Sequence, residues 1–150
     1  LYKSLIEEKR MAVMAHAYGG PSKYADTFIF FSSPRHPHTA EEVEAAIYEE
    51  LEKLKTTPVT DRELQKIKNQ LEAGFIRSLE SASGLASEIS SYESISGWRY
   101  INTLVEKTVA VTPEDIMRVA NKYFTKTNRT VAIIVNKKKG KEAAHENKGS

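Results

Sequence analysis

The sequence predicts an α+β domain in which an antiparallel β-sheet is covered on one side by helices, with elements roughly in the order β-β-α-α-α-α-β. Three observations predict this class. Two short β-type segments lie near the start of the chain, apolar residues then recur at helical spacing as far as residue 124, and a β-rich run follows at residues 129–135. Because strands and helices do not alternate, a parallel sheet built from βαβ units is not expected.

The first three elements are the end of a helix and a hairpin. Residues 1–10 carry apolar side chains at helical spacing and finish in charged residues, which indicates the last turns of a helix. Side chains of residues 11–18, "MAVMAHAY", alternate along a strand that a Gly-Gly-Pro turn ends. The aromatic run "TFIFFSS" at residues 27–33 is expected to pair with that strand as its antiparallel neighbour.

Two long helices are predicted next, each with a start signal. Thr39 and Glu42 form a capping-box pattern, and the helix ends at the Thr56-Thr57-Pro58 stretch. Thr60 and Glu63 repeat the pattern for the second helix. One apolar stripe is expected to face inward from the second helix, made of Leu64, Ile67, Leu71, Phe75 and Leu79.

Shorter elements complete the predicted domain. A small-residue helix within residues 81–98 is expected to stop at Gly97, and a short helix follows at residues 99–108. The strongest start signal is Thr112 as the cap with a proline at the first helical position. The run Arg129–Val135 is predicted as a final buried strand.

Composition limits the classes of function. The chain has 150 residues, 40% of them hydrophobic and 28% charged, which suits one domain at residues 1–136. It has no cysteine, so disulfides, thiolate metal sites and cysteine nucleophiles are excluded. Residues 137–150 form a basic tail that is expected to be solvated and disordered, with no nucleic-acid partner. No apolar run approaches the roughly 18 residues that a membrane helix needs, so no spanning segment is expected.

The stretch "HPHTAEE" is the first candidate metal site, because it differs by one residue from the zinc-peptidase pattern H-x-x-E-H. His38 precedes the cap residue Thr39, so its ring is not expected to share a helix face with Glu42. The favoured interpretation is a polar loop and a helix start. A metal site of His36, His38 and Glu41 in another geometry is the alternative.

Other candidates are weaker. His16 lies in the first strand, where a hydrogen-bonded sheet residue is more common than a metal ligand, and His145 lies in the tail. Trp98, Arg99 and Tyr100 form either a stacking platform or a plug at the edge of the core. No paired acid and base and no phosphate-binding glycine loop are evident, so no catalytic residue and no metal ligand are predicted in this chain.

Several phrases carry a resemblance to a known family. "LYKSLIEEKRMAVMAHAY", "TTPVTDRELQKIKNQL" and "VTPEDIMRVANKYF", together with the order of elements, resemble the C-terminal, non-zinc domain of the M16 metallopeptidases. These are the pitrilysin, insulinase and mitochondrial-processing-peptidase-like zinc proteases. The resemblance covers roughly residues 1–136 and implies their LuxS/MPP-like metallohydrolase fold. Because the chain begins inside a helix, it is expected to be a fragment truncated at its N-terminal side.

The resemblance also implies a function. Two such domains or subunits enclose a chamber in which peptides are cleaved, so the expected partners are an N-terminal M16 domain, a second M16 subunit and a peptide or unfolded protein substrate. Zinc is expected in the intact enzyme but outside this chain, which by itself is expected to be inactive. This chain would form the chamber wall and the domain interface. Many bacterial relatives are exported, which favours the periplasm.

The substrate-holding pair of the family is missing here. Many members have an Arg and a Tyr seven residues apart, and these positions fall at Ile6 and Val13. Arg10 and Tyr18 are eight apart and do not replace them. Two alternatives to a peptidase domain therefore stay open, a structural subunit like the core proteins of respiratory complexes and a free-standing peptide-binding domain. Likewise, the bulky strand residues, among them Phe30, could line a chamber or pack under the helices.

Overall fold

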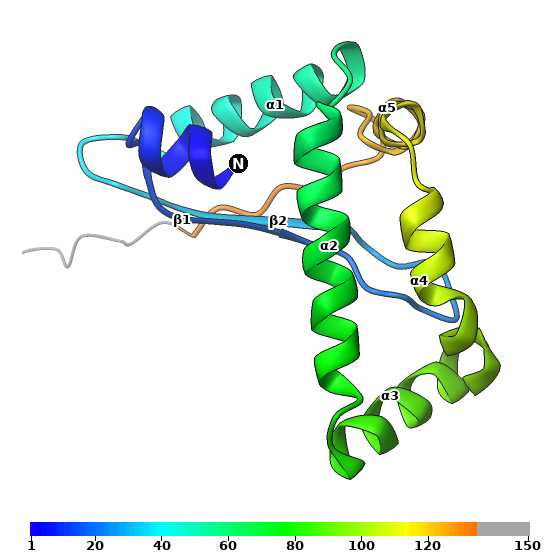
Figure 1. Cartoon of the computed structure of the whole chain (residues 1–150). Helices are drawn as coiled ribbons and strands as arrows, with labels where there is room; N and C mark the ends of the chain where they lie inside the picture. The colour runs from blue at the N-terminus through cyan, green and yellow to red at the C-terminus, as the bar shows by residue number, and fades with distance from the viewer. Residues whose placement is uncertain (135–150) are drawn as a thin grey trace, which may run out of the picture.

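The computed structural model describes residues 1–134, and it confirms an α+β arrangement of helices with an antiparallel hairpin (Figure 1). The elements are η1 (Tyr2–Glu8), β1 (Ala12–Tyr18), β2 (Ile29–Pro34), α1 (Ala40–Thr56), α2 (Asp61–Ser78), α3 (Ala82–Ile95), η2 (Trp98–Tyr100), α4 (Ile101–Ala110) and α5 (Pro113–Tyr123). Five α-helices follow the hairpin, including the two predicted at residues 99–108 and after Thr112, so the rough order given above is one helix short of the helices predicted one by one. The first helix, η1, is a π-helix.

The strands β1 and β2 form the whole sheet within residues 1–134, and their register contains a β-bulge. Ala12 lies opposite Pro34 and Met14 opposite Ser33, so Val13 is the extra residue of β1. A bulge reverses the side-chain alternation. As a result Ala12 and Ala15, three residues apart, are both buried, which the strict alternation predicted for residues 11–18 does not allow.

The core is small and lies where η1, β1 and α1 meet. Its buried side chains are Leu5, Ala12, Ala15, Val43 and Ala46. Leu5 is fully buried and is much the largest contributor from η1. This core holds the hairpin against η1 and α1.

Helix starts agree with their sequence signals. Thr39 and Glu42 form a complete capping box at α1, and Thr112 forms one with Asp115 at α5. At α2 the Thr60 side chain accepts a hydrogen bond from the Glu63 amide. These caps satisfy amide groups that the first turn of a helix leaves without partners.

The apolar stripe of α2 is not buried, contrary to the prediction. Ile67 is 50% exposed and Leu71 is 56% exposed, while the rest of the stripe is only half-buried. In Figure 1, α2 extends beyond the hairpin to α3 instead of lying flat on the sheet, and α2 packs against α3 and α4. Helical periodicity predicts an apolar face but does not specify what covers it. Ile67 and Leu71 are called the α2 ridge below.

The prediction of a final strand at Arg129–Val135 is also wrong within the described residues. Residues 129–134 have no strand structure, and no backbone hydrogen bond joins them to β1 or β2 in the described part of the chain. Val131 and Ile133 are exposed, so the run is not buried. A β-rich segment forms a strand only when an edge is available for pairing at the right place. The predicted tail and Val135 lie outside the described residues.

No helix within residues 1–134 is both long enough and apolar enough to cross a membrane.

Candidate functional site

One face of the hairpin points away from the core and is the candidate site. In the register, His16 pairs with Phe31 and Tyr18 pairs with Ile29, so these four side chains share one face. We call this set the outer face. Residues of the opposite parity, such as Ala15, point towards α1, which lies above the hairpin in Figure 1.

The outer face is apolar and uncovered. Tyr18 is 60% exposed, Phe31 is 50% exposed and Ile29 is 37% exposed, and His16 is exposed beside them. Aromatic and β-branched residues favour strands, so the same side chains that form the hairpin also make its free surface. Contiguous exposed apolar residues commonly mark an interaction site.

Of the aromatic residues of the other parity, Phe30 is half-buried, whereas Phe28 is 52% exposed. The rings of Phe30 and Phe124 lie 5.4 Å apart in an edge-to-face arrangement, and Phe28 lies 5.2 Å from Phe30. This cluster joins the hairpin to the end of α5. The two alternatives for the bulky strand residues thus apply to different residues. Phe30 is half-buried and packs against Phe124 at the end of α5, whereas Tyr18 and Phe28 are exposed.

Phe28 also explains a glycine in the turn. A Cβ at Gly19 would lie 2.6 Å from the Phe28 ring, so a side chain there would push the ring out of place. The Gly-Gly-Pro turn that ends β1 thus allows close packing of the loop against Phe28.

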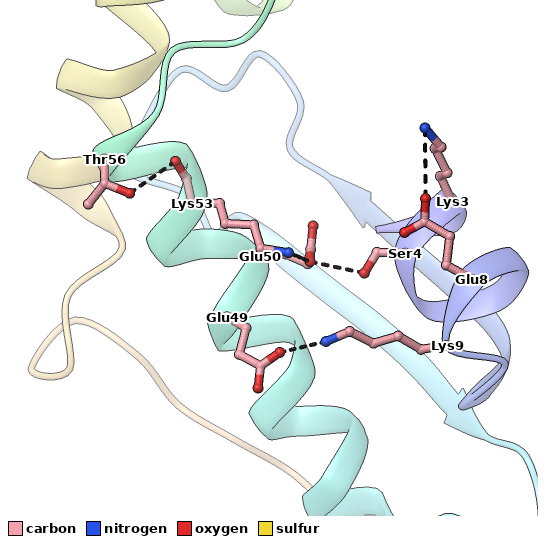
Figure 2. A network of polar contacts seen from close by, with 8 residues as sticks. All are labelled: Lys3, Ser4, Glu8, Lys9, Glu49, Glu50, Lys53 and Thr56. Atoms are coloured by element: carbon pink, nitrogen blue, oxygen red, sulfur yellow. Dashed lines mark hydrogen bonds and ion pairs between the residues drawn. The ribbon is translucent and has the colours of Figure 1, made fainter.

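Polar contacts fasten η1 to α1 and so set the direction in which β1 leaves it (Figure 2). The hydroxyl of Ser4, which is buried, donates a 2.9 Å hydrogen bond to Glu50. Lys53 forms a 2.5 Å ion pair with the same carboxylate. Lys9 reaches Glu49 at 2.5 Å. We call these five residues the clamp.

The clamp changes the acidity of its carboxyl groups. The hydrogen bond and positive charge of Lys9 lower the pKa of Glu49. Partial burial alone would raise the pKa of Glu50, but hydrogen bonds from Lys53 and Ser4 outweigh it, so the pKa of Glu50 is lowered. Both groups therefore stay ionised at neutral pH, as structural anions and not as proton donors.

The positions equivalent to the family's Arg and Tyr lie at this corner. Ile6 is half-buried against the core, while Val13, at the bulge, is 56% exposed. Neither side chain can donate a hydrogen bond. Arg10 lies in the turn between η1 and β1, where its backbone has a positive φ of 52°.

"HPHTAEE" acts as a helix start in the structure. Contrary to the expectation from sequence, the His38 ring does meet Glu42: it lies 3.0 Å from the carboxylate, because the Glu42 side chain reaches back past the helix start. The same carboxylate accepts a hydrogen bond from the Thr39 amide. That amide first, and then His38, lower the pKa of Glu42. His36 and Glu41 are exposed, and they do not join His38 in any group that could hold a metal within residues 1–134.

Trp98, Arg99 and Tyr100, the other candidates from the sequence, do not form one shared stacking surface. Trp98 stacks with Arg99, with the guanidinium 4.8 Å from the ring centroid, and Trp98 is partly exposed. Tyr100 instead stacks on Tyr92 at 5.7 Å, on a different partner. His145 lies outside the described residues.

Among the described residues, no three His, Cys, Asp or Glu side chains lie together in a way that could hold a metal ion, so these residues do not fit zinc. Sequence reasoning missed Phe31 and the clamp. Phe31 could have been identified by counting from the turn, whereas the pairing of Ser4 with Glu50, 46 residues later, leaves no local signal.

Comparisons with known proteins point to one family. The model of the "Peptidase M16 inactive domain" family matches residues 1–71. The chain is 29% identical over 134 residues to "Zinc protease PqqE" of Helicobacter pylori, covering 89% of this chain and 30% of that protein. A crystal structure of a protease from Helicobacter pylori matches with a TM-score of 0.79 at 30% identity, covering 84% of this chain and 30% of that one. The chain thus spans about 30% of the length of these relatives.

Proposed function

We propose that the chain is a domain of the C-terminal, inactive type of the M16 peptidase family, and that it holds peptide in a zinc peptidase without cleaving it. The outer face would line the space that encloses the substrate. The zinc would be bound by another domain, and zinc-activated water would supply the hydrolytic chemistry there.

One observation carries this proposal. The hairpin is packed on its inner face by α1 and Phe124, while its outer face exposes Tyr18, Ile29 and Phe31 together. A peptide wall requires a firmly supported backbone with free apolar side chains. The outer face meets both requirements, and Ile6 and Val13 supply no polar substitute for the family pair.

A binding assay tests the wall. We expect a fluorescent, unfolded peptide to bind the full chain, and Phe31→Ser to weaken binding about tenfold by removing a half-exposed aromatic contact. Tyr24→Ser is the matched control, because Tyr24 is 78% exposed in the hairpin loop but lies off the outer face. Equal affinity of the two variants would show that the outer face does not bind the peptide.

The α2 ridge is the proposed interface with the zinc-binding N-terminal M16 domain. Ile67 and Leu71 lie one helical turn apart and are both half-exposed, which suits packing against an apolar surface of another domain. We expect Leu71→Glu to weaken association with such a domain in size-exclusion chromatography. Asn69→Glu adds the same charge on the opposite side of α2, where Asn69 is exposed, and should not.

The structural-subunit alternative predicts a different pair of results. A scaffold would associate through the α2 ridge but would not bind peptide at the outer face. Association that is sensitive to Leu71→Glu, combined with peptide binding that is absent, would therefore favour a scaffold over a peptidase domain.

A further inference from the structure

The extensively packed pairs of elements fall into two sets that share no member. In the first set, η1, β1, β2, α1 and α5 pack against one another, and we call this set the body. In the second set, α2, α3, η2 and α4 pack against one another, and we call these residues, 61–110, the arm. In Figure 1 the arm extends away from α1, with α3 at its far end.

Side-chain burial divides the chain in the same way. Every buried residue within residues 1–134 belongs to the body, from Ser4 and Leu5 in η1 to Ala120 in α5. The helices of the arm contain no buried residue. The arm therefore contributes no side chain to the core that holds the body together.

Specific contacts hold the arm together. The Lys68 ammonium group donates a 2.7 Å hydrogen bond to the Val109 carbonyl, which joins α2 to the end of α4. The Tyr92 ring stacks on the Tyr100 ring with their centroids 5.7 Å apart, which joins α3 to η2. In the described part of the chain, by contrast, no side-chain hydrogen bond, ion pair or aromatic contact joins the arm to the body.

Two short segments connect the arm to the body. Residues 57–60 lead from α1 into α2, and residues 111–112 lead from α4 into α5. Thr57 and Val111 have extended backbones, with ψ of 121° and 134°, so each interrupts helical hydrogen bonding. The body stays closed between these segments, because the Asn121 side-chain amide of α5 donates a 3.0 Å hydrogen bond to the Lys55 carbonyl of α1.

We infer that the arm turns as one stiff unit about residues 57–60 and 111–112, while the body keeps its shape. Residues at the ends of packed elements absorb the backbone rotation of a hinge. Little burial opposes the movement, because the buried core lies in the body. The α2 ridge lies on the arm and the outer face lies on the body, so the hinge changes the angle between them. This inference depends on contacts and burial within the chain, and not on what either surface binds.

Distances between pairs of spin labels on the full chain test the hinge. The chain has no cysteine of its own, so the labels attach only to introduced cysteines. Glu41→Cys with Ser91→Cys spans the body and the arm, Glu41→Cys with Lys122→Cys lies within the body, and Arg62→Cys with Ser91→Cys lies within the arm. All four residues are exposed. We expect the spanning pair to give a distance distribution about twice as wide as that of either internal pair.

A change in one connection sharpens the test. Pro58→Gly should widen the distribution of the spanning pair further, because glycine frees the backbone of residues 57–60. Pro21→Gly is the matched control, since Pro21 is also exposed but lies in the hairpin loop, and it should leave that width unchanged.

Two results would overturn the inference. A spanning distribution as narrow as those of both internal pairs would show that the arm is fixed to the body. A distribution within the arm as wide as the spanning one would show that the arm is not a single unit. If Pro58→Gly does not fold by circular dichroism, the three pairs in the otherwise natural chain still decide. Peptide binding enters none of these measurements, so failure of the hinge is distinct from failure of the proposed function.

Discussion

Ser4 and Glu50 are joined by a 2.9 Å hydrogen bond that fastens η1 to α1 across 46 residues of sequence. The Ser4 side chain is buried, so its hydroxyl has no access to bulk water as an alternative partner. Because β1 follows η1 after one short turn, this contact helps to fix where the hairpin begins. The clamp therefore acts on the start of the hairpin, and the outer face lies at the other end of the same strand.

Loss of this contact should destabilise the protein. We expect Ser4→Ala to lower the free energy of unfolding by roughly 1–2 kcal/mol, because a buried hydrogen bond to a charged group is lost. Urea denaturation measures it. Glu52→Gln is the control, since its ion pair with Lys55 lies at the surface and should contribute less than about 0.5 kcal/mol. Equal effects would contradict the importance of the clamp.

Acid should weaken the fold. The pKa values of Glu42, Glu49, Glu50 and Asp115 are all lowered in the folded chain. The unfolded chain therefore takes up protons first, at its ordinary carboxyl pKa of about 4, and stability falls as the pH drops through and below that value. Urea midpoints between pH 7 and pH 3 test this. A midpoint that does not fall would contradict it.

The variant Glu50→Gln separates the clamp from the other carboxyl groups. It keeps the shape of the side chain but has no acidic proton equilibrium. We expect it to be less stable than the natural chain at pH 7, with a smaller loss between pH 7 and pH 3. An unchanged pH dependence would show that Glu50 contributes nothing to acid sensitivity.

Core and surface leucines should differ sharply. Leu5→Ala removes the fully buried side chain of η1 and should cost about 2–5 kcal/mol. Leu71→Ala makes the same chemical change on the half-exposed α2 ridge and should cost under about 1 kcal/mol in the isolated chain. Thermal or urea unfolding distinguishes them. Similar losses would mean that the α2 ridge is buried in solution.

The N-cap of α5 should contribute measurably to the free energy of unfolding. Thr112→Ala removes the side-chain acceptor for the Asp115 amide and should lower the free energy of unfolding by about 1 kcal/mol. Thr103→Ala is the control, because its hydroxyl bonds to a carbonyl group one turn earlier within the same helical region. That change should be close to neutral. A neutral Thr112→Ala would contradict the cap.

Local signals in the sequence predicted the local structure well. Thr39 with Glu42 and Thr112 with Pro113 mark helix starts because capping acts over three or four residues of the chain. Gly97, with a φ of 90°, ends α3 for an equally local reason.

Features that depend on distant partners were not predictable. The bulge at Val13 arises from the register between two strands, and no residue type in β1 predicts it. The exposed Ile67 and the missing strand at 129–134 have the same cause, since periodicity identifies an apolar face but not its neighbour. The outer face depends on the register between β1 and β2. The sequence could therefore predict that aromatic residues occur in both strands, but not which of them share a face.

A photoreactive phenylalanine analogue at position 31 of the full chain tests directly whether the outer face holds peptide. The chain is incubated with an unfolded peptide and zinc, irradiated, and examined by mass spectrometry. We predict a cross-link to intact peptide, and far less cross-linking from the same analogue at position 24. Peptide that is shortened in a zinc-dependent way by the pure chain, or equal cross-linking from both positions, would contradict a peptide-holding domain that does not itself hydrolyse its ligand.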